Sequence, residues 1–302
     1  MFRHLGTFPF FFSATITDFP IVNHVAPEAV GSPFKSLSHA RGSLEWLMSR
    51  TVALVRAADA YRLSGDSAVP IPAAFVMEQQ LLNAELAGWR GGLLSFEPKS
   101  CGTNELMRVI LEMRWLVCKI WVNTCLAREE IIYDNHRSEF CCLVELGKRA
   151  ISSRGAFTTK IARFMFEMAH CPILHFVVLK CRYLRLRLEA LSLVKELSCP
   201  RQMLWDAGVS YALGRRIVEI EHGLELSLEK AVTLSDVHKD LNLPSEGQRV
   251  LGAAVERQVG EHSCVNGTKV LRRKTRFLTR DLESGGLKAV QDWITIRKIT
   301  PI

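Results

Sequence analysis

Apolar side chains recur every three or four residues from about residue 36 to residue 228, and this spacing constrains the fold more than any other feature of the chain. An α-helix turns once in about 3.6 residues, so the pattern places these side chains along one helical face. The first such stripe ends before the turn SGDSAVPIP, where Gly65, Pro70 and Pro72 stop a helix. Its members are Leu44, Leu47, Met48, Val52, Val55 and Ala58.

The same spacing predicts further helices, joined by short connections. Asn104 is a suitable N-cap for the third helix, whose apolar arc is wide enough to be covered on both sides. Short connections place consecutive helices antiparallel, so we expect helical hairpins in an irregular bundle or an α-solenoid-like array. The helices expected after the first are residues 73–94, 104–127, 128–152, 157–180, 183–197 and 203–228.

The C-terminal stretch has a different pattern, TKVLRRKTRFLTRDLESGGLKAVQDWITI, rich in Thr, Val, Phe and Ile. The segment ESGG separates two extended runs, residues 268–282 and 287–299, which we interpret as a β-hairpin. We therefore expect a mainly α fold with a C-terminal β-hairpin. The chain divides into a mobile or loosely docked tail at 1–34, a helical domain at 35–262 and a hairpin extension at 263–302.

Length, composition and charge indicate whether the chain can span a membrane and what kind of partner it can bind. The 302 residues have an ordinary globular composition, and no apolar run reaches about 18 residues, so no transmembrane helix is expected. The aromatic run near the N-terminus imitates a secretion signal, but Pro9 interrupts it and no clear small-residue cleavage site follows. The net charge of +8 permits an acidic partner without requiring one.

The nine cysteines are odd in number, and none forms a CxxC pair. Several lie within apolar helical patterns, which indicates buried, reduced thiols in an intracellular protein and not a disulfide framework. Zinc modules draw their ligands from closely spaced cysteine pairs, so we expect no bound zinc. The GxSxG, HExxH, GxGxxG and P-loop signatures of common enzymes and nucleotide-binding proteins are also missing from the sequence.

The stretch KCRYLRLRLEALSLVKEL, residues 180–197, carries five basic side chains, and a helical projection separates most of them from its leucines. Arg182 and Arg185 fall on a polar stripe that also holds two glutamates. A helix that tracks phosphates would show an uncompensated basic face. The pattern therefore indicates a core helix with one solvated face.

Arg187 of the same helix lies instead on the apolar arc. An unpaired guanidinium there would be costly to desolvate, so we expect a carboxylate within hydrogen-bonding distance. The candidates are Glu167, Asp206 and Glu219. The alternative is an arginine whose head extends to solvent along its aliphatic stem.

Two groups of residues are candidates for a metal-binding or catalytic site. The segment REEIIYDNH offers carboxylates and an imidazole to a metal, but no second group at ligand spacing accompanies it, and Asp134 also suits a helix N-cap. In AHCPILH, Pro172 disrupts the helical spacing and the surroundings are apolar, which favours packing over catalysis. The first group is Glu129, Glu130, Asp134 and His136, and the second is His170, Cys171 and His175.

The densest positive patch is KVLRRKTRFLTR, in the first run of the predicted hairpin. Such a patch could serve nuclear import or contact with nucleic acid. An edge strand that its charges protect from aggregation explains the alternation of side chains more simply, and we favour that interpretation. The basic residues are Lys269, Arg272, Arg273, Lys274, Arg276 and Arg280.

Four stretches together carry a resemblance to a known family. They are AELAGW at 84–89, KIWVNTCLAREEIIYDNHRSEFCCLVEL at 119–146, FTTKIARFMFEMAHCPILHFVVLKCRYLRLRLEALSLV at 157–194 and CPRQMLWDAGVSYALGRRIVEIE at 199–221. The most specific part is VVLKCR with the arginines and leucines after it, followed by PRQMLWD. The chain resembles, over about residues 34–225, the regulatory region of fungal transcription factors of the six-cysteine binuclear zinc-cluster class.

The resemblance implies an all-helical region that regulates activity and partner contacts and is not an enzyme. It implies a nuclear location, or a cytoplasmic one for a truncated form, and as partners the transcription machinery, another transcription factor or a second copy in a dimer. The chain departs from the family in having no CxxC pair. Zinc is therefore expected only in a longer form, and this chain alone should bind no specific nucleic acid. The alternative is a helical enzyme or small-ligand-binding protein that uses a cavity between helices.

Overall fold

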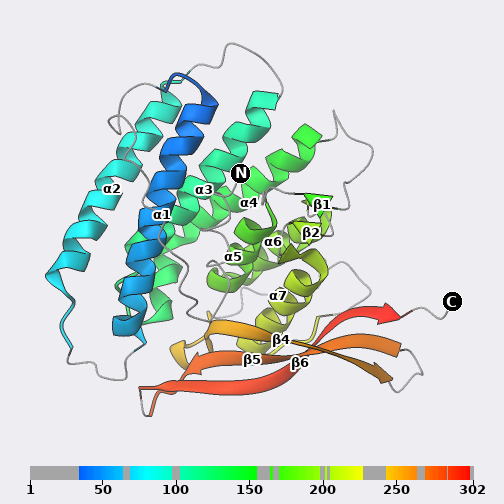
Figure 1. The fold of residues 1–302 in the computed structure, drawn as a ribbon. Coiled ribbons are helices and arrows are strands. Elements are labelled where there is room, and N and C mark those ends of the chain that lie inside the picture. Colours follow the sequence, from blue (N-terminus) through cyan, green and yellow to red (C-terminus); the bar gives the residue numbers. More distant parts are fainter. Residues whose placement is uncertain are drawn as a thin grey trace.

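The computed structural model is mainly helical, with seven α-helices and a three-stranded antiparallel sheet near the C-terminus in the residues it describes (Figure 1). The fold class expected from the sequence is therefore confirmed. The expected tail at 1–34 lies almost wholly outside the described residues. These are 34–63, 69–96, 103–154, 164–165, 170–197, 201–202, 205–226, 243–263, 269–283 and 285–299.

The first three helices pack against one another at one side of the molecule (Figure 1). They are α1 (Leu37–Arg62), α2 (Ala73–Leu94) and α3 (Thr103–Thr124). Two tryptophans join them, because the indole of Trp89 donates to the carbonyl of Ala40 at 2.9 Å and that of Trp115 donates to Leu86 at 2.8 Å. Asn104 lies inside α3 and is not its N-cap.

A second group of elements continues the bundle and shares a large apolar core with α3. They are the 3₁₀ helix η3 (Glu130–His136), α4 (Arg137–Arg154), α5 (Cys171–Lys180), α6 (Leu184–Leu197) and α7 (Ala207–His222). Phe176 of α5 lies in the centre of this core. Its ring packs edge-on against Trp121 of α3, with the ring centroids 5.8 Å apart, and against Tyr133 of η3 at 6.4 Å.

Two of the expected helices begin later than the sequence pattern predicts. Residues 128–152 do not form one helix, because η3 precedes α4. The helix expected at 157–180 begins only at Cys171, after the short strand β1 (Phe164–Met165). Pro172 lies in its first turn, where a missing N–H costs nothing, whereas deeper in a helix the ring would break it.

The helix expected at 203–228 is also shorter. Asp206 caps α7 by accepting a hydrogen bond from the backbone N–H of Val209 at 3.0 Å, and Gly223 ends the helix with a left-handed φ of 62°. Before the cap, the chain forms a small sheet with β1. Its other strands are β2 (Arg201–Gln202) and β3 (Trp205–Asp206).

The C-terminal sheet has the strand order β4, β5, β6. The strands are β4 (Val250–Ser263), β5 (Lys269–Arg280) and β6 (Leu287–Ile299). The predicted hairpin is confirmed as β5 and β6. The sequence does not predict β4, because the glycine and alanines of VLGAAV weaken the strand signal, and the sheet therefore begins at residue 250 and not at 263. Since β5 is the central strand, the edge-strand interpretation of its basic patch is wrong.

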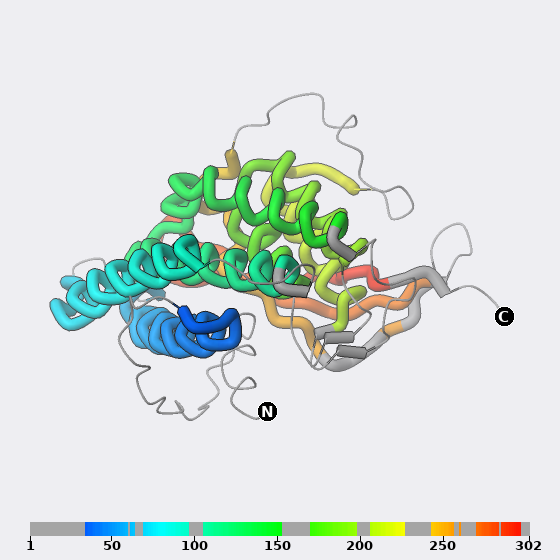
Figure 2. Tube along the Cα trace, turned by 90° about the horizontal axis from the view of Figure 1, so that it is seen from above, coloured from blue at the N-terminus to red at the C-terminus, as the bar shows by residue number. Residues whose placement is uncertain are grey.

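Helix α7 lies on one face of this sheet (Figures 1 and 2). On that face, Phe277 and Ile294 are buried against Ala212 and Ile217 of α7. No described helix lies over the opposite face of the sheet (Figure 1).

Six of the nine cysteines lie in the described part of the chain, and all six are free thiols. Cys141 and Cys142 are exposed on α4, and the other four are buried, as their apolar surroundings in the sequence predict. Among the described helices, none combines the length and apolar character needed to cross a membrane.

Candidate functional site

Arg187 is buried and paired with a carboxylate, as the sequence predicts, but the partner is different. Its side chain is 0% exposed, and its Nη1 atom lies 2.5 Å from Oε2 of Glu221. Its Nε atom donates to the carbonyl of Val178 at 2.8 Å. Arg187 therefore joins α6 to α5 and α7, and the alternative in which it extends to solvent is wrong.

Of the three expected partners of Arg187, the two that the structure describes, Asp206 and Glu219, have other partners. Asp206 caps the N-terminus of α7. Glu219 accepts hydrogen bonds from Arg216 at 3.0 Å and from the backbone N–H of Leu226 at 3.1 Å. Glu167 lies outside the described residues.

Glu130 lies at the centre of the same cluster and is buried. Its carboxylate accepts hydrogen bonds from Lys180 at 2.8 Å, from Arg182 at 3.1 Å and from Arg62 at 3.4 Å. Burial alone would raise the pKa of Glu130, but the three cations outweigh burial and lower the pKa to about 2. Arg182 also contacts Glu221 at 3.3 Å, so two carboxylates share one guanidinium.

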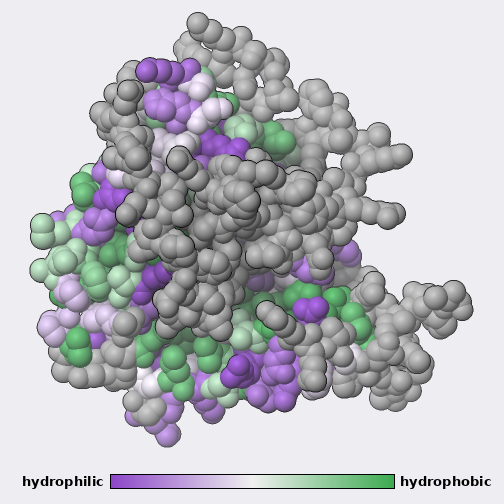
Figure 3. All heavy atoms as spheres, viewed as in Figure 1, coloured by the Kyte–Doolittle hydropathy of each residue, from purple (hydrophilic) through white to green (hydrophobic). Residues whose placement is uncertain are grey.

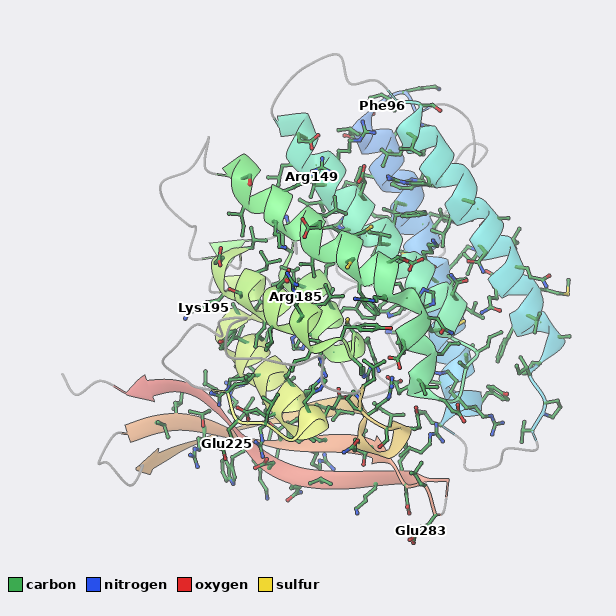
Figure 4. All side chains as sticks on the ribbon, turned by 180° about the vertical axis from the view of Figure 1, so that it is seen from behind. Phe96, Arg149, Arg185, Lys195, Glu225 and Glu283 are labelled. Atoms are coloured by element: carbon green, nitrogen blue, oxygen red, sulfur yellow. The ribbon has the colours of Figure 1, made fainter. Side chains whose placement is uncertain are left out.

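Arg182 is buried, and its expected place on a solvated stripe is therefore wrong. The reason is that α6 begins only at Leu184, so the helical projection does not extend to Arg182. Arg185 does lie on the solvated face, where it pairs with Glu189 at 3.0 Å. Figure 4 shows the labelled side chain of Lys195, farther along α6, pointing away from the helices.

Two contacts connect the sheet to this cluster. Arg249, just before β4, is buried and pairs with both carboxylate oxygens of Asp134, at 2.9 and 2.6 Å. Glu246 of the 3₁₀ helix η5 (Glu246–Gln248) accepts hydrogen bonds from the backbone N–H groups of Glu130 and Ile131 at 2.8 and 2.9 Å. Arg249 and Glu246, which both precede β4, therefore hold the start of this strand against η3.

We call this cluster the buried ion network. Its members are Arg62, Glu130, Asp134, Lys180, Arg182, Arg187, Glu221, Glu246 and Arg249. It also bonds to the backbone of β4, because Glu221 accepts from the N–H of Val250 at 2.7 Å and Lys180 donates to the carbonyl of Leu251 at 3.0 Å. Each of its carboxylates accepts at least two hydrogen bonds within the protein. The network therefore fastens the sheet to the helices.

The four residues considered as metal ligands are not brought together at one site. Glu130 and Asp134 belong to the buried ion network, whereas Nδ1 of His136 lies 3.7 Å from the carboxylate of Glu139. Glu129 is the N-cap residue of η3, without a side-chain capping bond. Within the ranges that the structure describes, no group of three or more His, Cys, Asp or Glu side chains could hold a metal ion.

The histidines and the cysteine of AHCPILH are buried at the start of α5. Cys171 belongs to the apolar core shared with α3, α4 and α6. Burial lowers the pKa of His175 to about 4, so this imidazole is neutral near pH 7. His170, Cys171 and His175 therefore have the surroundings of packing residues.

The basic residues of β5 do not share one location: one lies at the end of the strand, and the others lie along it on both faces of the sheet. Arg280, at the end of the strand, donates to the carbonyls of Arg62 at 3.2 Å and Arg128 at 2.8 Å, so it ties the hairpin tip to the helices. Lys269 begins the strand, and Arg273 faces the side of the sheet on which Phe277 is buried, since alternate residues of a strand share a face. The remaining three, Arg272, Lys274 and Arg276, face the opposite side.

Helix α2 carries an exposed apolar surface that the sequence reasoning missed. Its charged side chains all contact neighbouring helices: Glu78 and Glu85 pair with Arg50 of α1, and Arg90 pairs with Glu112 of α3 at 3.2 Å. The sequence contains a signal for this surface, because these three are the only charged residues among the 22 of the helix.

The exposed residues of α2 are therefore apolar or small, apart from the uncharged Gln80. Met77, Leu81 and Leu94 are 69%, 49% and 58% exposed, and Ala84 and Gly91 are exposed between them. On the left side of Figure 3, where α2 lies, pale and dark green spheres are visible with purple ones among them. We call these five residues the α2 outer face.

Comparisons of the chain with models of known protein families, with curated proteins and with solved structures find no match.

Proposed function

We propose that this chain is a regulatory region that acts in transcription, in the nucleus, by binding a partner protein through the α2 outer face. One observation carries the proposal: all three charged side chains of this 22-residue helix at the edge of the bundle pair with neighbouring helices, and none belongs to the α2 outer face. An exposed apolar patch of this kind marks a surface that another molecule covers.

The spacing of the α2 outer face indicates what covers it. Its residues follow one another at intervals of three, four and seven, so they form one stripe about 25 Å long. Stripes of this kind pack against a second amphipathic helix. The partner would therefore present an apolar helix, as a second copy, another transcription factor or a component of the transcription machinery.

The resemblance to zinc-cluster transcription factors supports transcription as the setting of this contact. A chain with no CxxC pair has no zinc cluster with which to read DNA. Under this proposal the protein reaches promoters through its partner, or as part of a longer form that contains the cluster.

The test is a reporter assay with the full chain fused to a heterologous DNA-binding domain. We expect the fusion to change reporter transcription relative to the DNA-binding domain alone. Leu81→Glu and Met77→Glu place a charge on the α2 outer face and should abolish the change, whereas Lys195→Glu on the exposed side of α6 should preserve it. An unchanged reporter with the parent chain, or equal effects of all three variants, would contradict the proposal.

A further inference from the structure

We propose that the outer face of the C-terminal sheet binds single-stranded nucleic acid with little sequence preference. The surface is a row of three basic side chains on the central strand, Arg272, Lys274 and Arg276, with Trp293 of β6 beside it. It lies on the sheet and not on α2, so it would add a second function to the one proposed above.

The orientation of the row follows from the buried side chains of β5. Val270 is buried before the pairing irregularity between Leu271 and Arg272. Beyond this irregularity, Thr275 and Phe277 are both buried, and Phe277 packs with Ile294 beneath α7. Successive side chains of a strand point to opposite faces. Lys274 and Arg276 therefore point away from the helices, and Arg276 is exposed.

Among the described residues, Arg272, Lys274 and Arg276 form no ion pair, in contrast to the paired arginines of the buried ion network. Their cross-strand partners in register are uncharged: Ala254 and Gln291 beside Arg276, Trp293 beside Lys274, and Gly260 and Thr295 beside Arg272. On the β4 side, the irregularity between Val255 and Val259, which contains Glu256, lies opposite Lys274. The acidic residue of this part of β6, Asp292, faces the other side and pairs with Arg216 of α7.

The geometry of the row suits an extended chain of phosphates. Alternate residues of a strand lie about 7 Å apart, so the three cations form a line along β5 that a flexible polyanion can follow.

Trp293 indicates that the polyanion carries bases. It is 38% exposed, and its Cα atom is paired in register with that of Lys274. Sheets that bind single strands combine basic side chains with an exposed aromatic ring on which a base stacks. An acidic peptide or an anionic membrane would use the charges of the row but would have no base to stack on Trp293.

The experiment measures binding of the full chain to fluorescently labelled oligo-U and oligo-dT of about 12 nucleotides by anisotropy. We expect binding that weakens with salt. Lys274→Ala and Arg276→Ala should each weaken binding and reduce the salt slope by about 0.7 for each phosphate that the variant no longer neutralises. Trp293→Ala should weaken binding at least about fivefold, and Trp293→Phe should retain most of the affinity. A preference for one oligonucleotide identifies RNA or DNA as the natural ligand.

Lys288→Ala is the matched control, because it removes the same charge from an exposed position of β6 in register with the opposite face. This variant should bind like the parent, and equal thermal melting curves should show that all variants are folded. The proposal is overturned if neither oligonucleotide binds at low salt, if Lys288→Ala weakens binding as much as Lys274→Ala, or if Trp293→Ala has no effect. Tighter binding to anionic vesicles or to polyglutamate would also overturn it.

Discussion

Replacing Arg187 with alanine removes the group that joins α6 to α7 in the buried ion network. The variant no longer has the 2.5 Å ion pair with Glu221 or the 2.8 Å hydrogen bond to the carbonyl of Val178. Glu221 keeps two other donors, the N–H of Val250 and the guanidinium of Arg182. Breaking a buried ion pair costs about 3–5 kcal/mol. Because Glu221 stays partly paired, we expect the free energy of unfolding to fall by about 3 kcal/mol.

Urea unfolding followed by far-ultraviolet circular dichroism measures this loss. The matched control is Arg185→Ala on the same helix, whose side chain is 75% exposed and pairs with Glu189, so it should lose less than about 1 kcal/mol. The double variant with Glu221→Gln should lose less than the sum of the two single variants, because both act on one ion pair. If Arg187→Ala is no less stable than Arg185→Ala, the buried ion network does not hold these helices together.

Three further predictions concern the pH dependence, the attachment of the sheet and metal content. The pKa of Glu130 is about 2 in the folded protein, below its usual 4.5, so its contribution to stability is complete above about pH 5 and is lost as the pH falls towards 2. Glu130→Gln should therefore flatten the decline of the urea midpoint between about pH 5 and pH 3, and an unchanged decline would contradict this. Arg249→Ala should accelerate amide hydrogen exchange in β4, β5 and β6 before it affects α1 to α3, and equal acceleration in both would contradict the attachment role. Metal analysis after dialysis should find no stoichiometric zinc, and one or two tightly held ions per chain would refute the prediction.

The helices follow from the sequence because apolar spacing reports directly which face of a helix is buried. The wrong predictions concern places where the local backbone chemistry of proline, glycine and alanine obscures where an element begins. Pro172 lies in the first turn of α5, and the apolar spacing before it does not reveal this start. The strand β4 is hidden because Gly252, Ala253 and Ala254 have low strand propensity and are held by pairing with β5.

The buried ion network is predictable only in part. Arg187 is identified because a charge on an apolar arc needs a partner. The partner is not identified, because Glu219 and Glu221 differ by about 200° around the axis of α7, and only the packing of that helix decides which of the two reaches Arg187. Arg249 has no local signal, since its contact with Asp134 joins residues far apart in the chain.

The α2 outer face was open to prediction, since three charged residues among 22 are few for a helix at the edge of a bundle. Apolar spacing identifies the side of a helix that is buried, such as that of Leu82, Leu86 and Trp89. It does not by itself show that the other side lacks charge.

The most direct test of the proposed function is a site-specific crosslink from the α2 outer face in living cells. A photoreactive residue is placed at Leu81 in the full chain, and an identical one at Lys195 on α6 serves as the control. We predict that the probe at Leu81 captures one protein, identified by mass spectrometry as a second copy, a transcription factor or a component of the transcription machinery, and that the probe at Lys195 does not. Capture at Leu81 of nothing beyond the control, or of proteins with no role in transcription, would contradict the proposal.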